Sequence, residues 1–177
     1  MKRLTDKPLI MALNLAAMTI VVGSASLFAA PAGSKALTGQ DRKHFLNDKF
    51  QTSYSSSALP ASVKALYAAP PLNEPPPSGA QMAFPMAEPG KPWNVGDAVQ
   101  DTSLPFRRLI FVAVSKDYCV VAYERGGIAY SRSTALFHFN GKKAELRWAG
   151  NILGPSQSLH DVRVAIKTNK YRDGGLL

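Results

Sequence analysis

The dipeptide Asn140-Gly141 constrains the fold of this chain more than any other feature of its sequence. Both central positions of a two-residue hairpin turn need positive φ, which asparagine and glycine adopt most readily. The segments on either side, residues 128–139 and 143–149, are rich in β-branched and aromatic side chains. The sequence therefore predicts a β-hairpin here, whose two strands pair in an antiparallel sheet.

This turn also fixes which side chains share a face of the sheet, because successive residues of a strand alternate between faces. With Asn140 and Gly141 as the loop, Phe139 opposes Lys142, Phe137 opposes Ala144, and the apolar face continues to Ser133 opposite Trp148. The other face is basic and is our candidate binding site. Its residues are Tyr130, Arg132, His138, Lys143 and Arg147.

Two further strands are predicted over residues 108–115 and 118–124, joined by the turn Lys116-Asp117 and followed by the loop Arg125-Gly126-Gly127. Short connections of this kind join antiparallel neighbours. Residues 109–114 are apolar on both sides, which is typical of a strand that is covered on both faces. We therefore expect a four-stranded antiparallel β-meander with protein packed against each side.

A C-terminal helix follows the predicted sheet. Ser158 and Asp161 form a capping pair, and the apolar residues that follow recur at helical spacing: Leu159, Val162, Ala165 and Ile166. We expect a helix over residues 158–170 that packs on the sheet, followed by a frayed tail from Arg172. The predicted fold class is α+β, with the folded domain at residues 93–177.

The N-terminus has the order of a secretory signal, in which basic residues precede an apolar stretch and then small residues. Lys2, Arg3 and Lys7 precede residues 8–34, which carry no charge. We predict a signal peptide within residues 1–32 that ends after Ala25 or Ala32, and a periplasmic or secreted protein. The alternative is an uncleaved anchor, because residues 9–30 reach the roughly 20 apolar positions that span a bilayer.

Between the signal segment and the sheet, the sequence predicts short helices and then a linker. Thr38 and Asp41 form a capping pair before Phe45, and Pro60 suits the first turn of a second helix, so residues 33–67 are read as a short helical segment. Residues 68–92 contain eight prolines and are predicted to be a proline-rich linker. Within it, Met82, Phe84 and Met86 alternate, which favours a short edge segment against the domain.

The chain has a formal net charge of +9, and most of this excess lies beyond residue 32. A basic balance favours anionic partners. The expected partners are an anionic polysaccharide, a lipid headgroup or a partner protein, whereas nucleic acid is not expected and a membrane is expected only if the N-terminal segment stays uncleaved. The single cysteine, Cys119, excludes an intrachain disulfide, and its apolar neighbours favour burial over pairing with another chain.

No residue pattern indicates catalysis. His44, His138 and His160 do not have metal-ligand spacing, and Gly126-Gly127 lacks the glycine pattern of a phosphate loop. We therefore predict no catalytic residues, no metal and no cofactor. The predicted function is an exported binding or inhibitor module of the cell envelope whose basic sheet face takes an anionic ligand. The alternative is a structural or assembly protein of the envelope, with exposed strands and the linker as docking elements.

Overall fold

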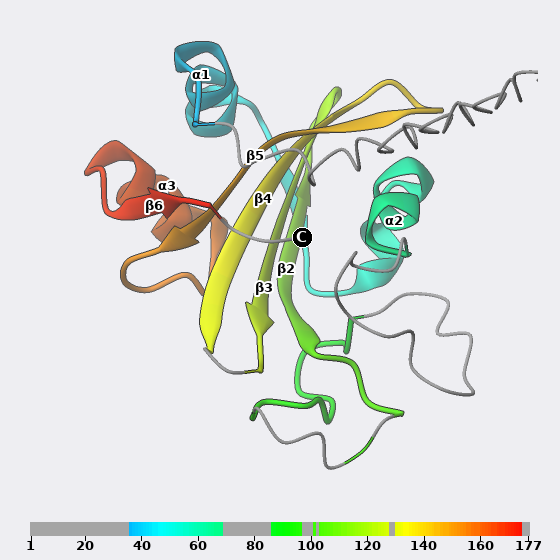
Figure 1. The fold of residues 1–177 in the computed structure, drawn as a ribbon. Helices are drawn as coiled ribbons and strands as arrows, with labels where there is room; N and C mark the ends of the chain where they lie inside the picture. The colour runs from blue at the N-terminus through cyan, green and yellow to red at the C-terminus, as the bar shows by residue number, and fades with distance from the viewer. Residues whose placement is uncertain (1–35, 69–85, 97–100, 102, 128–129, 175–177) are drawn as a thin grey trace, which may run out of the picture.

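A computed structural model of the protein describes residues 36–68, 86–96, 101, 103–127 and 130–174. These residues form one antiparallel sheet of six strands in sequence order, with helices on both sides of it (Figure 1). The strands are β1 (Gln51–Ser53), β2 (Arg107–Val114), β3 (Tyr118–Arg125), β4 (Ser131–Phe139), β5 (Ala144–Ile152) and β6 (Tyr171–Asp173). The helices are α1 (Gly39–Asn47), the 3-10 turn η1 (Ser56–Ala58), α2 (Ala61–Ala68) and α3 (Leu159–Lys167).

The central four strands confirm the predicted meander, and the α+β class is confirmed with it. The strand count is different, because two short edge strands add to the sheet. β1 forms within residues 33–67, which were predicted to be a short helical segment, and β6 forms in the expected tail. Both cover the outer edges of long strands, whose backbone donors and acceptors otherwise lack partners.

The β4–β5 hairpin has a register two residues away from the predicted one. Asn140 does not enter the loop: its backbone N–H donates to Lys143 O at 3.0 Å, and its side chain accepts from Lys143 N at 3.1 Å. Gly141, with φ +81°, is therefore the first of two loop residues, and Phe139 opposes Ala144 instead of Lys142. A glycine in the first central position is the requirement of a type II′ turn, which explains the shift.

A shift of two residues keeps every side chain on its predicted face, but a β-bulge then moves Trp148 and the β5 residues after it to the opposite face. The register changes between Leu136 and Phe137, so that Trp148 opposes Leu136 and not Ser133. The prediction that Trp148 shares the Phe137 face is therefore wrong. The indole is fully buried on the other face and donates to Asp173 Oδ1 at 2.6 Å.

Each face of the sheet carries its own core, as the two-sided apolar pattern of β2 predicts. Figure 1 shows α1 and α3 on one side and α2 on the other, and we call these the α1/α3 face and the α2 face. The α1/α3 face buries Phe45, Phe111, Val120, Leu136, Trp148, Val162 and Ile166. The α2 face buries Val63, Tyr67, Leu109, Cys119, Val121, Tyr123 and Phe137.

Both predicted helix caps are confirmed. The Thr38 side chain accepts from Asp41 N, and Ser158 and Asp161 form a capping box at the start of α3. Arg42 and Arg163 then join the two helices. Arg42 donates to Ile166 O at 2.6 Å, and Arg163 donates to Phe45 O at 3.0 Å.

Only the ends of the proline-rich stretch lie within the described residues, and the predicted signal segment lies outside them. At one end, the Met86 side chain is buried in the α2-face core, and Ala87 bridges to Arg108 of β2. At the other end, α2 buries Val63 and Tyr67 in the same core. Residues 36–68, which sequence reasoning placed outside the domain of residues 93–177, thus pack on the same sheet.

Candidate functional site

The five predicted site residues fall at two ends of the sheet. Tyr130 and Arg132 lie where β4 begins, whereas His138, Lys143 and Arg147 lie near the β4–β5 hairpin. Arg132 and His138 are six positions apart on one strand, which corresponds to about 20 Å at roughly 3.4 Å per residue. The structure therefore brings the first two residues together and keeps the other three away from them.

Two of the three residues at the hairpin end, Arg147 and His138, have structural partners. The Arg147 Nε donates to Asp41 Oδ1 at 3.2 Å, and Asp41 is only 1% exposed. This hydrogen bond raises the pKa of the Arg147 guanidinium. His138 packs edge-on against Tyr118 with ring centroids 5.2 Å apart, while the Lys143 side chain is exposed in the turn. Arg147 and Asp41 thus join the sheet to α1, a role that sequence reasoning did not foresee.

At the other end, Glu124 is the centre of a polar network across three strands. Arg108 of β2 holds its Oε2 through Nε at 2.7 Å and Nη2 at 2.5 Å. On the opposite side, the Tyr130 hydroxyl donates to Oε1 at 2.7 Å, and Arg132 Nε donates to that hydroxyl at 3.2 Å. Burial raises the pKa of the Tyr130 hydroxyl, and its bond to Glu124 raises it further, so Tyr130 stays a proton donor.

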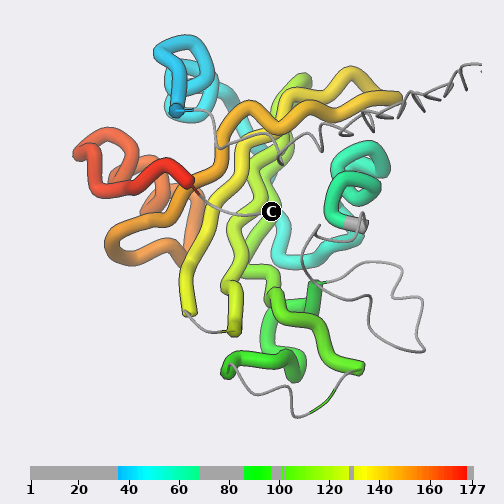
Figure 2. Tube along the Cα trace, in the orientation of Figure 1, coloured from blue at the N-terminus to red at the C-terminus, as the bar shows by residue number. Residues whose placement is uncertain are grey.

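The chain before β2 supports this network from the side. The Arg108 guanidinium lies over the Trp93 ring, 5.1 Å from its centroid, and Trp93 also contacts Tyr130 at 6.3 Å between centroids. The neighbouring Asn94 fixes the loop, because its side-chain amide donates to Asp101 O at 2.7 Å and Leu104 O at 2.9 Å. In Figure 2 this segment passes beneath the end of the sheet, where β2 begins.

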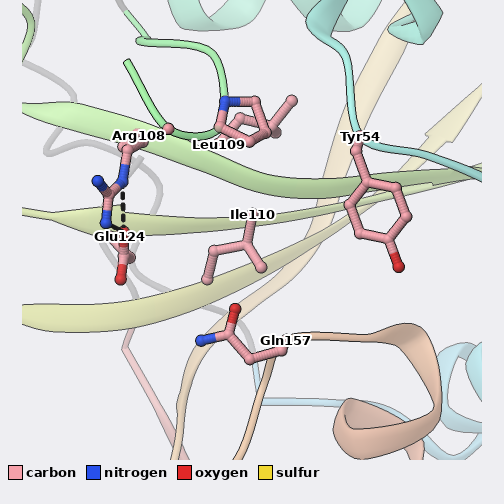
Figure 3. A pocket seen from close by; sticks show the side chains of 8 residues that line it. Tyr54, Arg108, Leu109, Ile110, Glu124 and Gln157 are labelled. Carbon is pink, nitrogen blue, oxygen red and sulfur yellow. Dashed lines mark hydrogen bonds and ion pairs between the residues drawn. The ribbon is translucent and has the colours of Figure 1, made fainter. Parts of the chain in front are cut away.

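A hollow of about 340 Å³ opens beside the Arg108–Glu124 pair, and we call it the Arg108 pocket. Figure 3 shows Ile110 between that ion pair and the Tyr54 ring, with the Gln157 amide facing Ile110. The complete lining is Tyr54, Pro89, Gly90, Arg108, Leu109, Ile110, Glu124 and Gln157. The volume is that of a small binding site, and the lining combines an apolar floor with several hydrogen-bonding groups.

The network leaves a positive charge beside this pocket. Two guanidinium groups, Arg108 and Arg132, share the one carboxylate of Glu124, whose side chain is 9% exposed. Arg132 approaches Glu124 Oε1 only to 3.9 Å, beyond hydrogen-bond distance. Its side chain is 36% exposed and is therefore partly accessible to a ligand.

Sequence reasoning missed the pocket residues Arg108 and Glu124, and it missed Trp93, which lies against Arg108. The turn Lys116-Asp117 alone would extrapolate to Arg108 opposite Arg125. A β-bulge at Ile110 shifts the register by one residue and places Arg108 opposite Glu124 instead. A turn signal carries no information about a bulge six residues away, so the sequence offered no signal for this ion pair.

Other chemistries find little support in the described part of the chain. No group of three His, Cys, Asp or Glu residues there could hold a metal ion, and no described helix is long and apolar enough to cross a membrane. Cys119 is buried, and burial raises its pKa to about 12, so its thiol stays protonated at neutral pH. Comparison with models of known families, with curated proteins and with solved structures finds no match for this chain.

Proposed function

We propose that this protein is an exported binding module of the cell envelope, which takes an acidic polysaccharide at the Arg108 pocket and the adjacent Arg132. The observation that carries the proposal is the sharing of one buried carboxylate by two guanidinium groups beside an accessible hollow. A negatively charged group on a ligand would balance the remaining positive charge. Arginine forms strong charge-assisted hydrogen bonds with such groups.

The lining favours a sugar acid over a simple anion. Glu124 repels a bare anion in the pocket but accepts hydrogen bonds from hydroxyl groups, and Gln157 offers both a donor and an acceptor. Tyr54 is 59% exposed at the rim and presents an aromatic surface against which a sugar ring can pack. A ligand that carries hydroxyl groups and an acid group on one ring would satisfy all of these partners at once.

Export is the second part of the proposal, and its support is the N-terminal sequence. The order of Lys2, Arg3 and Lys7 before the uncharged residues 8–34 matches a secretory signal. Protein recovered outside the cytoplasm would establish cleavage if its intact mass corresponds to a chain that begins near Ser26 or Gly33. Recovery of the uncut chain only in membranes would establish the anchor instead.

Binding is tested by calorimetric titration of the protein with a hexamer of galacturonic acid and with a neutral hexasaccharide of the same length. We expect saturable binding of the acidic hexamer alone, which weakens as salt screens the charges. The variant Arg132→Gln should bind at least about tenfold more weakly, since a hydrogen bond to a charged group contributes roughly 1.5–3 kcal/mol.

The matched control is Lys143→Gln, which removes the same charge from the exposed turn at the other end of the sheet. We expect this variant to bind as tightly as the parent. Equal losses in both variants would mean attraction to overall charge without a site, and would refute the proposal. So would tight binding to vesicles of anionic lipid without binding to the acidic hexamer.

An assembly role is the second candidate, because the outer edge of β5 before Gly150 pairs with no strand in the described residues. Glu145 and Arg147 on this edge oppose pairing with another chain, because charged side chains protect a strand edge, so we rank assembly below binding. Sedimentation that shows a stable oligomer without ligand would favour assembly over binding.

A further inference from the structure

Arg107 is the only arginine with a buried, unpartnered side-chain nitrogen among the described residues. It begins β2 directly before Arg108, so its side chain points to the α2 face while that of Arg108 points to the α1/α3 face. Arg107 is 5% exposed, and its Nε is buried without a hydrogen-bond partner. A buried guanidinium without an opposite charge is strongly unfavourable, because desolvation of the ion is not repaid.

The surroundings of Arg107 add positive charge. Arg125 is its direct partner across the β2–β3 ladder, so two like charges face one another on the same side of the sheet. Within the described residues, no carboxylate forms an ion pair with Arg107.

The aromatic neighbours do not provide the missing charge. Tyr67 and Tyr123 pack edge to face at 5.9 Å between centroids, and both lie close enough to sense the charge of Arg107. Burial raises the pKa of both phenols, so they stay neutral at physiological pH. Neutral hydroxyl groups can donate to an anion beside Arg107, but they cannot replace one.

We propose that Arg107 is the centre of a second anion-binding site, on the α2 face, which takes a carboxylate or phosphate group beside its guanidinium. The group would accept a hydrogen bond from the guanidinium of Arg107 and supply the opposite charge that this buried group lacks. This site is distinct from the Arg108 pocket, because the two lie on opposite faces of the sheet. Its existence does not depend on the function proposed for that pocket.

Thermal unfolding of the full chain tests this site in sodium chloride, sodium acetate and sodium phosphate at equal pH and ionic strength. Acetate represents the carboxylate and phosphate represents the tetrahedral oxyanion. We expect a saturable rise in Tm with at least one of them relative to chloride, of roughly 3–6 °C at about ten times the Kd. The anion that gives the rise identifies the chemistry that the site prefers.

The variant Arg107→Met keeps the aliphatic volume and removes the charge. It should lose the response to acetate and phosphate, and its Tm in chloride should equal or exceed that of the parent, because an unpaired buried charge has been removed. Arg132→Gln is the control and should keep the full response. A rise in Tm with acetate or phosphate that persists in Arg107→Met would overturn the assignment. Equal Tm values of the parent protein in all three salts would also overturn it, whatever the variant does.

Discussion

Gly126 shows how closely single residues fit around the Arg108 pocket. It directly follows β3 and lies against the loop that carries Trp93, and its N–H donates to Phe106 O at 2.9 Å. A Cβ on Gly126 would overlap the backbone oxygen of Asn94 and lie 2.8 Å from that of Val95. Backbone atoms cannot move aside as the end of a flexible side chain can, so this position accepts only glycine without a shift of the loop.

We therefore predict that Gly126→Ala lowers the free energy of unfolding by about 1–3 kcal/mol, the usual cost of overpacking. Gly39→Ala is the matched control, because a Cβ there meets nothing within 4 Å and the residue opens α1. Urea unfolding of both variants provides the comparison. Equal stabilities would show that the loop is not held against Gly126.

Cys119 gives a prediction about alkaline stability. Burial raises the pKa of its thiol from 9.0 to about 12 in the folded protein. Between these values the unfolded chain releases the thiol proton and the folded chain keeps it, so the free energy of unfolding falls as pH rises. The slope from this one group is about 1.4 kcal/mol per pH unit.

Urea unfolding at several pH values between 9 and 11 measures this slope, with Cys119→Ala as the comparison. The variant should be less stable at pH 7, because it leaves a small cavity, but its stability should fall less steeply with pH. Tyr67 and Tyr123 add to the alkaline loss in both proteins, since burial raises their pKa values as well. Parallel curves for parent and variant would contradict a buried, protonated Cys119.

At the scale of elements, the attachment of α1 depends on one buried carboxylate. Asp41 accepts from Thr38 Oγ1 at 2.6 Å and from Arg147 Nε at 3.2 Å, which joins the helix cap to β5. We predict that Arg147→Gln destabilises the protein by roughly 1–3 kcal/mol, because it leaves this buried carboxylate with fewer donors. Lys143→Gln should change the free energy of unfolding by less than about 0.5 kcal/mol.

The two variants also separate stability from binding among the residues first expected to share one site. Arg147→Gln should bind the acidic hexamer as the parent does, provided that it is measured at a temperature where it is folded. A loss of binding without a loss of stability would mean that Arg147 contacts the ligand, and would contradict the separation of Arg147 from the site at Arg132.

The central strands and both helix caps could be predicted because each depends on residues that are close in sequence. The apolar pattern of β2 and β3 and the spacing of Ser158 and Asp161 are examples. The bulges at Ile110 and between Leu136 and Phe137 could not, because they depend on what packs against the strands. Tyr130 and Arg132 could be assigned to the basic face because side chains alternate along the strand that leads to the Asn140-Gly141 turn. Arg108 and Glu124 could not be paired, because they lie opposite one another only as a result of the bulge at Ile110.

At the scale of the whole molecule, both sheet faces are closed by segments that precede the proline-rich stretch. Phe45 of α1 is completely buried on one face, and Val63 of α2 is completely buried on the other. Each such side chain contributes roughly 1.5–3 kcal/mol when it is buried. A fragment that begins after the linker would expose both cores to water.

We predict that residues 36–177 unfold in one cooperative transition and that residues 86–177 do not. The shorter fragment should bind a hydrophobic dye and aggregate on heating, because the apolar faces around Phe111 and Leu109 lose their cover. Circular dichroism melts of both fragments decide the matter. If residues 86–177 alone keep the stability of the longer fragment, the sheet folds without α1 and α2, and the packing of these helices is dispensable.

The central claim is that an anionic ligand binds at the Arg108 end of the sheet, and the two tryptophans report on it directly. Trp93 lies beneath the Arg108 guanidinium and beside Tyr130, whereas Trp148 is buried in the α1/α3-face core with its indole N–H on Asp173. A proton–nitrogen NMR spectrum separates their indole signals during titration with the galacturonic acid hexamer. We predict that the Trp93 signal moves saturably while the Trp148 signal stays in place. Saturable binding that leaves the Trp93 signal unmoved would contradict the site proposed here.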